Sequence, residues 1–188
     1  MPRYVALLRA INVGGHIVKM EDLRALFKSM KFKSVETFIA SGNVIFETEL
    51  SATEVGPKIE ECLRKALGYE VATFLRSDTE VAEIAYYMPF SEPDIASAAT
   101  FCVGFLAAPL SAGAARRAMG FKTPDDDFHV HGRELYWISR LRQSDSTFSN
   151  SAFEKALGIR ATFRGMNTVR KLAAKYPPPE HAANQRNS

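Results

Sequence analysis

The sequence has no apolar run long enough to cross a membrane, which takes about 18 consecutive apolar residues. Its first apolar run, Tyr4 to Leu8, is stopped by Arg9 and is shorter than the core of a secretory signal, about 7–15 residues. The only two cysteines, Cys62 and Cys102, are too few for a disulfide framework. We therefore expect a soluble, cytoplasmic protein with free thiols and no membrane partner.

The chain also lacks the short motifs of several enzyme classes. It has no Walker phosphate loop, no dinucleotide fingerprint and no nucleophile elbow. His129 and His131 lie two apart on a predicted strand, but no third ligand follows closely, so neither a metal nor a cofactor is predicted. A base–nucleophile pair of His16 and Ser41 is one alternative, but no carboxylate is placed to orient His16. Whether the protein is an enzyme is left open.

What the chain does have is a globular composition, with 46% hydrophobic and 24% charged residues. Its net charge of +3 is unevenly distributed. Residues 1–98 carry 11 Lys/Arg and 14 Asp/Glu, a net −3, whereas residues 99–188 carry 13 and 7, a net +6. The basic half indicates either an anionic partner or a solvated basic face.

Hydrophobic periodicity predicts the same order of elements twice. Residues 1–76 alternate between strand-like runs and helical stripes in the order βαββαβ, and residues 99–164 repeat that order. Such a unit is the ferredoxin-like split βαβ motif, with four antiparallel strands and both helices on one face. The predicted fold class is therefore α+β, a tandem duplication of a ferredoxin-like unit.

The remaining segments are predicted to connect or follow these two units. Residues 77–98 are predicted as a linker helix and a loop, because Ser91 to Ala98 has a linker composition. Residues 165–177 are predicted as a C-terminal helix with Asn167 as its N-cap. Residues 178–188 begin within a triple proline and are predicted to form a disordered tail.

Several segments resemble those of a bacterial family known as domain of unknown function 1697. They are YVALLRAINVGGH, the hairpin IASGNVIF, FLRS, Pro89-Phe90 and NTVRKL. The resemblance extends over nearly the whole chain up to the triple proline. It implies an α+β fold with a ferredoxin-like repeat and no established activity. One departure is visible, because Arg164-Gly165-Met166-Asn167 stands where such sequences often have Arg-Asn-aromatic-Asn.

The strongest candidate site lies at one edge of the first predicted sheet. In a split βαβ unit the end of the first strand lies beside the start of the third, so the loop 9–19 and the turn 41–43 should meet. Gly14-Gly15 leads into a helix N-terminus, where free N–H groups and the helix dipole favour an anion. The predicted ligand-binding residues are Arg9, Asn12, Gly14, Gly15, His16, Lys19, Ser41 and Asn43. They predict binding of a small phosphate- or carboxylate-bearing ligand, unless the glycines and Asn43 serve only the turns.

A second candidate is a basic patch in the C-terminal half. In the last strand Arg160, Thr162 and Arg164 alternate with apolar residues, which predicts one basic, exposed face. Tyr136 and Trp137 lie in the neighbouring hairpin, where they either stack on nucleic-acid bases or pack in the core. The predicted patch residues are Arg140, Arg160, Arg164 and Asn167. They indicate a nucleic-acid-binding module, and a scaffold protein that dimerises through a sheet face is a third alternative.

Overall fold

The computed structural model describes residues 1–12, 14–39 and 42–179. The chain divides into two compact units. The first unit comprises Met1–Ile84 with the segment from Lys171 onward, and the second comprises Ala85–Arg170. Within the described part of the chain, no helix is long and apolar enough to cross a membrane. Most of the predicted tail, from residue 180 on, lies outside the described residues.

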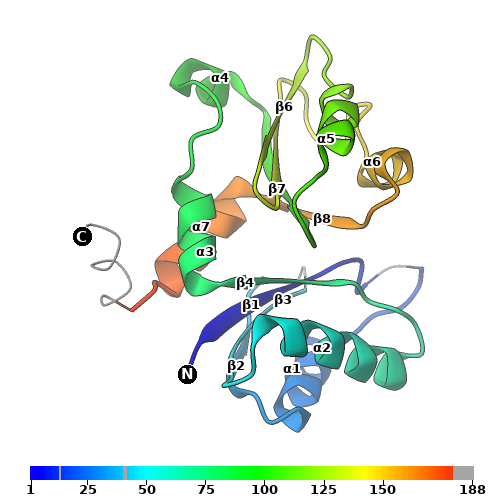
Figure 1. The fold of residues 1–188 in the computed structure, drawn as a ribbon, viewed down its shortest axis with the longest axis vertical. Coiled ribbons are helices and arrows are strands. Elements are labelled where there is room, and N and C mark those ends of the chain that lie inside the picture. Colours follow the sequence, from blue (N-terminus) through cyan, green and yellow to red (C-terminus); the bar gives the residue numbers. More distant parts are fainter. Residues whose placement is uncertain (13, 40–41, 180–188) are drawn as a thin grey trace. The chain divides into compact units, whose positions relative to one another are not determined.

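The first unit is a four-stranded antiparallel sheet with two helices on one face, drawn in blue to green in Figure 1. Its elements are β1 (Arg3–Leu8), α1 (Met20–Ser29), β2 (Lys33–Thr37), β3 (Asn43–Glu47), α2 (Ala52–Leu67) and β4 (Thr73–Ser77). The strand order is β2-β3-β1-β4, and every neighbouring pair is antiparallel. This is the arrangement that a split βαβ motif produces.

The two helices of the first unit are held on the sheet by apolar stripes. Leu23 and Phe27 of α1 are fully buried, as are Val55, Ile59 and Leu63 of α2. Their spacing of four residues places them on one side of each helix. All five belong to one hydrophobic cluster with the sheet, and burying each such side chain stabilises the fold by about 1.5–3 kcal/mol.

The second unit repeats this architecture. Its elements are β5 (Thr100–Leu106), α5 (Ala112–Met119), β6 (Asp126–His131), β7 (Glu134–Ser139), α6 (Asn150–Leu157) and β8 (Ala161–Gly165). The strand order is β6-β7-β5-β8, which matches the first sheet element for element. In Figure 1, α5 and α6 lie on the same face of this sheet. The predicted α+β fold with two tandem ferredoxin-like units is thus confirmed.

A close approach in the second sheet explains one glycine. Gly104 lies in β5 beside Phe163 of β8. A Cβ atom at residue 104 would lie 2.7 Å from two atoms of the Phe163 ring. Real Cβ atoms do not approach so closely, so only glycine at residue 104 leaves room for this ring.

Three further helices connect or follow the sheets: α3 (Asp78–Tyr86), α4 (Glu92–Ser97) and α7 (Met166–Lys175). The start of α3 is fixed by Ser77, whose hydroxyl accepts a hydrogen bond from the backbone of Glu80 at 3.1 Å. The predicted loop at 91–98 contains the short helix α4, because Ser91 caps it and Pro93 suits its first turn. Helix α7 begins at Met166, so Asn167 lies inside the helix and is not its N-cap.

The end of α7 is attached to the first unit through strand β2. The hydroxyl of Tyr176 donates to Glu36 Oε2 at 2.6 Å, and Lys175 Nζ lies 3.1 Å from the same oxygen. The Tyr176 ring also meets Phe38 edge-on, with centroids 6.3 Å apart. These contacts explain why the segment from Lys171 onward belongs to the first unit.

Candidate functional site

The loop that follows β1 lies against the hairpin tip that precedes β3. Leu7 is the register partner of Asn43, and the backbone N–H of Leu8 donates to the Gly42 carbonyl at 2.8 Å. A Cβ at residue 42 would lie 3.1 Å from Ile11 and 3.2 Å from Leu8. The two segments therefore meet where the central strands β1 and β3 end, as the topology predicts. We call this region the loop edge.

The loop itself is held closed by two side chains. Asn12 Oδ1 accepts a hydrogen bond from the backbone of Val18 at 2.8 Å, which joins the two ends of the loop. The hydroxyl of Tyr69 donates to the Ile11 carbonyl at 2.8 Å, and the Tyr69 ring lies 4.5 Å from the His16 ring. The Asn12 side chain thus stabilises the loop itself. His16 is exposed to solvent, and its ring lies beside the ring of Tyr69.

The exposed part of the loop edge contains Gly14, Gly15 and two basic residues, His16 and Lys19. Gly14 and Gly15 have φ angles of 62° and 83°, and no heavy atom lies within 4 Å of a Cβ placed on either. Both glycines are therefore required by backbone conformation, and they leave open space above the chain. Lys19 is the N-cap residue of α1 and makes no capping hydrogen bond with its side chain.

The helix that starts here already carries negative charge near its N-terminus. Glu21 and Asp22 lie in the first turn of α1, where carboxylates interact favourably with the helix dipole. An anion bound beside Lys19 would have to compete with these two carboxylates. These carboxylates make the helix end unfavourable for a polyanion.

The remaining predicted residues of this site are placed differently. Asn43 is fully buried, and its Nδ2 donates to the Phe38 carbonyl at 2.9 Å, so it closes the hairpin and does not face solvent. Arg9 is half-buried and its backbone N–H donates to the Ala72 carbonyl at 2.9 Å. Ser41 lies outside the described residues. Gly14, Gly15, His16 and Lys19 are exposed in the same loop, whereas Arg9 is half-buried at the start of that loop.

The predicted basic patch is not one surface. Arg140 follows β7, whose last residue, Ser139, pairs with the start of β5. Arg160 precedes β8, whose first residue, Ala161, pairs with the end of β5. The two arginines therefore lie at opposite ends of the second sheet, about 20 Å apart for a strand of this length.

The alternation along β8 also misjudged which residues are exposed. Thr162 and Arg164 are buried, with 4% and 8% of their surfaces exposed, although the prediction placed them on an exposed basic face. Arg164 Nη1 donates to Thr162 Oγ1 at 2.8 Å and to the Phe163 carbonyl at 2.9 Å. Burial lowers the pKa of Arg164 to about 10. Asn167 is exposed on α7, whereas Arg164 is buried in β8.

The aromatic pair of the second hairpin belongs to the interior. Tyr136 and Trp137 are each 1% exposed, and Trp137 packs in the hydrophobic cluster of the second unit. Its indole Nε1 donates to Asp126 Oδ1 at 3.0 Å. Neither ring can stack on a nucleic-acid base in this conformation, so core packing accounts for both.

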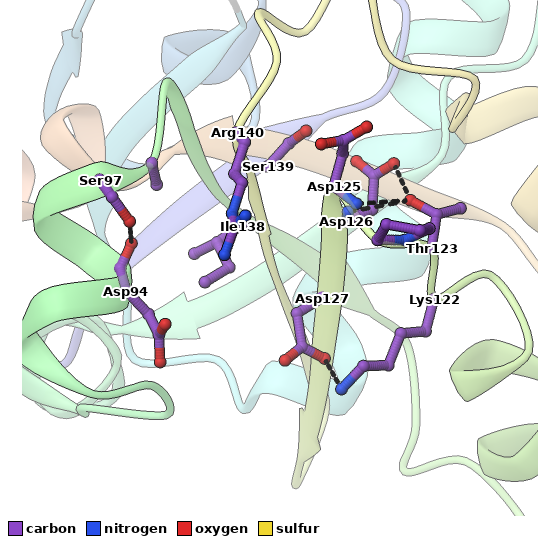
Figure 2. A pocket seen from close by; sticks show the side chains of 12 residues that line it. Asp94, Ser97, Lys122, Thr123, Asp125, Asp126, Asp127, Ile138, Ser139 and Arg140 are labelled. Carbon is purple, nitrogen blue, oxygen red and sulfur yellow. Dashed lines mark hydrogen bonds and ion pairs between the residues drawn. The ribbon is translucent and has the colours of Figure 1, made fainter.

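One polar pocket was not anticipated from the sequence. It has a volume of about 110 Å³ and is lined by α4, the segment before β6 and the end of β7, as Figure 2 shows. Its side chains include Asp94, Ser97, Lys122, Thr123, Asp125, Asp126, Asp127, Ser139 and Arg140. Lys122 Nζ is paired with Asp127 at 3.0 Å. Within the described residues, no group of His, Cys, Asp or Glu is arranged to hold a metal ion.

Asp126 lines this pocket, and its carboxylate accepts hydrogen bonds from other residues of the second unit. Besides the Trp137 indole, Oδ1 accepts from Ser146 Oγ at 2.9 Å, and Oδ2 accepts from Thr123 Oγ1 at 2.9 Å. Burial by itself raises the pKa of this carboxyl, but hydrogen bonds from Trp137, Ser139, Thr123 and Ser146 outweigh it and lower the pKa. The Asp126 carboxylate thus stabilises the fold of the second unit.

Comparison with known proteins identifies the family. The model of the family described as "Protein of unknown function (DUF1697)" matches residues 1–136. The chain belongs to the DUF1697 family. The match confirms the resemblance seen in the sequence over residues 1–136, whereas NTVRKL lies beyond the matched range. The family name records no activity and assigns no reaction. No curated protein matches the chain.

A solved structure supports the fold of this DUF1697 chain. The conserved bacterial protein SP0830 from Streptococcus pneumoniae is similar, with a TM-score of 0.70 and 21% sequence identity. The similarity covers 92% of this chain and 97% of that chain. At this identity the likeness shows the fold alone.

Backbone strain at the loop edge is the feature that sequence reasoning missed in this DUF1697 chain. Ala10 has a φ of 53° and Ile39 a φ of 56°, in the loop and in the hairpin respectively. A left-handed conformation costs a non-glycine residue about 1–2 kcal/mol, and a β-branched residue adopts it rarely. Such strain is concentrated at ligand-binding sites. Nothing in the residue types at these two positions signals it.

Proposed function

We propose that the loop edge binds a small anionic ligand carrying a phosphate or carboxylate group. The observation that carries the proposal is the exposed turn at Gly14 and Gly15, in a loop that Asn12 holds closed and that ends at Lys19, the N-cap of α1. Backbone N–H groups before a helix are suited to an anion, and an open space lies above both glycines. No reaction is part of this proposal.

Basic side chains supply the charge for such a ligand. Lys19 is exposed at the helix N-terminus, and His16 is exposed on the ring of Tyr69. Arg9 begins the same loop, and its planar guanidinium suits a two-point contact with phosphate or carboxylate. Ala10 of this loop and Ile39 of the neighbouring hairpin are strained, which supports a functional reason for the backbone conformation here.

A thermal-shift screen of phosphorylated and carboxylated metabolites tests the proposal. A ligand present at about 100 times its dissociation constant adds roughly 2.7 kcal/mol of stability, which corresponds to about 5–10 °C in a chain of this size. The double variant Arg9→Ala/Lys19→Ala should abolish the shift. Lys33→Ala, an exposed lysine on β2, is the matched control and should keep it. A shift that survives the loss of both Arg9 and Lys19 would rule out this site.

The carboxylates of the first helical turn provide a second test with the opposite sign. Glu21→Gln/Asp22→Asn removes two negative charges beside the proposed anion. We expect ligand affinity to rise by about twofold to fivefold at low salt and the gain to vanish at high salt. Unchanged or weaker affinity at low salt would contradict binding at this helix end.

A further inference from the structure

A groove lies at the other end of α1, between that end and the second half of α2. Its volume is about 630 Å³, within the range of about 300–1,000 Å³ typical of ligand pockets. We call it the lysine groove, and its lining residues are Ser29, Met30, Lys31, Lys58, Glu61, Cys62, Lys65 and Ala66. All of them belong to the first unit.

The charges of the lysine groove do not balance. Three lysines line it, and Glu61 is the single carboxylate among the lining residues. Glu61 is already neutralised, since it lies 2.9 Å from Arg64 and 3.1 Å from Lys65. Lys31 and Lys58 therefore leave a net positive charge that a ligand could compensate.

The floor of the groove is apolar. Met30 is buried, Cys62 is half-buried, and Ala66 adds a methyl group beside them. Lys58 lies over the ring of Phe32, with its Nζ 5.5 Å from the ring centroid, so its stem covers apolar surface. An occupant thus needs an apolar face together with negative charge.

Lys31 occupies a left-handed backbone position that favours glycine. It follows the end of α1 with a φ of 66°, and its backbone N–H donates to the Lys28 carbonyl at 2.9 Å. This left-handed position after a helix is usually occupied by glycine. A lysine that breaks a local folding rule while lining a basic groove indicates a role in binding.

We propose that the lysine groove is the docking site for an acidic, amphipathic helical segment of a partner protein. Lys58, Glu61, Cys62 and Lys65 follow the i, i+3, i+4, i+7 spacing of one face of α2, so this side of the groove is a continuous helix face along which an amphipathic helix can pack. Residues 58 to 66 of α2 extend for about 12 Å, enough for two turns of a bound helix. Charge complementarity selects glutamate or aspartate on that segment.

Cys62 provides a built-in probe of occupancy. It lies in the groove and is half-buried, whereas the other cysteine, Cys102, is buried. Burial raises the pKa of Cys102 to about 11, so its thiol is largely unreactive at neutral pH. Alkylation of the native protein by iodoacetamide, a neutral reagent, therefore reports on Cys62.

The test uses a synthetic 14-residue helical peptide with leucines on one face and glutamates beside them. We expect it to protect Cys62 from iodoacetamide in a saturable way, with an affinity that falls as salt rises. Lys58→Ala/Lys65→Ala should weaken binding about tenfold. A peptide with lysine in place of glutamate should give no protection. Failure of the glutamate peptide to protect Cys62 at 1 mM would overturn the proposal.

Lys31→Gly separates binding from folding. Glycine suits the left-handed position, so this variant should melt at a higher temperature than the parent while binding the peptide about threefold more weakly. Lys33→Ala is the control and should bind normally. Unchanged binding by Lys31→Gly would remove Lys31 from the site and overturn the argument built on its backbone conformation.

Two further outcomes are decisive. Protection of Cys62 by decanoate, without protection by the peptide, would show a site for small amphipathic anions and refute peptide docking. The groove variants should leave any thermal shift at the loop edge unchanged, because Lys19 and Lys31 lie at opposite ends of α1. Loss of one response therefore does not imply loss of the other.

Discussion

Asp126 offers the sharpest test of how the second unit is held together. The residue is 3% exposed, and its carboxylate accepts hydrogen bonds from Trp137, Ser146 and Thr123. These donors come from three different segments, namely β7, the loop before α6 and the loop before β6. We expect Asp126→Ala to destabilise the second unit more than any change at the neighbouring exposed aspartate, Asp125.

The magnitude follows from what each donor loses. The indole N–H of Trp137 would be left buried without an acceptor, which costs about 1–3 kcal/mol. The hydroxyls of Ser146 and Thr123 can rotate toward other acceptors, so each loses an ordinary hydrogen bond of about 1 kcal/mol. The sum, about 3–5 kcal/mol, is a large fraction of the net stability of about 5–15 kcal/mol that is typical of a protein.

Urea unfolding followed by tryptophan fluorescence measures this loss directly. Trp137 is the only tryptophan in the chain, so its signal reports the second unit. With a typical slope of about 2 kcal/mol per molar urea, the midpoint should fall by about 1.5–2.5 M. Asp125→Ala is the control, and a difference of less than 1 kcal/mol between the two variants would refute the reasoning.

The same carboxylate predicts a pH dependence. Its folded pKa is lowered, so its contribution to stability is present above the unfolded pKa of about 3.9 and is lost as the pH falls through the folded pKa. The stability difference between the parent protein and Asp126→Ala should therefore be constant at neutral pH and shrink below about pH 4. A difference that stays constant down to pH 2 would show that the carboxylate charge is not involved.

Two further changes test particular contacts. Gly104→Ala should lower the free energy of unfolding by about 1–3 kcal/mol, because its Cβ would lie 2.7 Å from the Phe163 ring, and adding Phe163→Leu should recover part of the loss. Tyr176→Phe removes the hydrogen bond to Glu36 and should cost about 1 kcal/mol in thermal unfolding, with faster proteolysis after α7. Equal stability of either variant and its parent would argue against the contact in question.

Much of the fold was predictable because periodicity directly encodes it. The stripes at Leu23 and Phe27 and at Val55, Ile59 and Leu63 identify α1 and α2, and the two hairpins follow from their turn residues. Helix α4 was missed because its six residues are too few for a periodic stripe, and only the capping by Ser91 marks its start. Topology alone also predicted that the loop after β1 meets the hairpin tip before β3.

The tasks of the individual site residues were less predictable. Asn12 and Asn43 were expected to face a ligand, yet each uses its side chain to hold the backbone of its own segment. Residue type does not reveal this, because an amide serves either purpose equally well. Along β8, alternation correctly separated two faces, but it could not tell that the face with Thr162 and Arg164 is buried.

The sequence by itself determined the order of elements, the tandem α+β architecture and the family, because each depends on local patterns of apolar, turn and motif residues. Only the tertiary structure decided which polar groups are committed to the fold and which remain exposed. Asp126 became structural because Trp137 and Ser146 bring donors to it from other segments. Asn43 and Arg164 bond to near neighbours in the chain but are buried by packing, whereas Gly14, Lys19 and Lys31 were left facing solvent. Burial is a property of the packed chain, and no single segment specifies it.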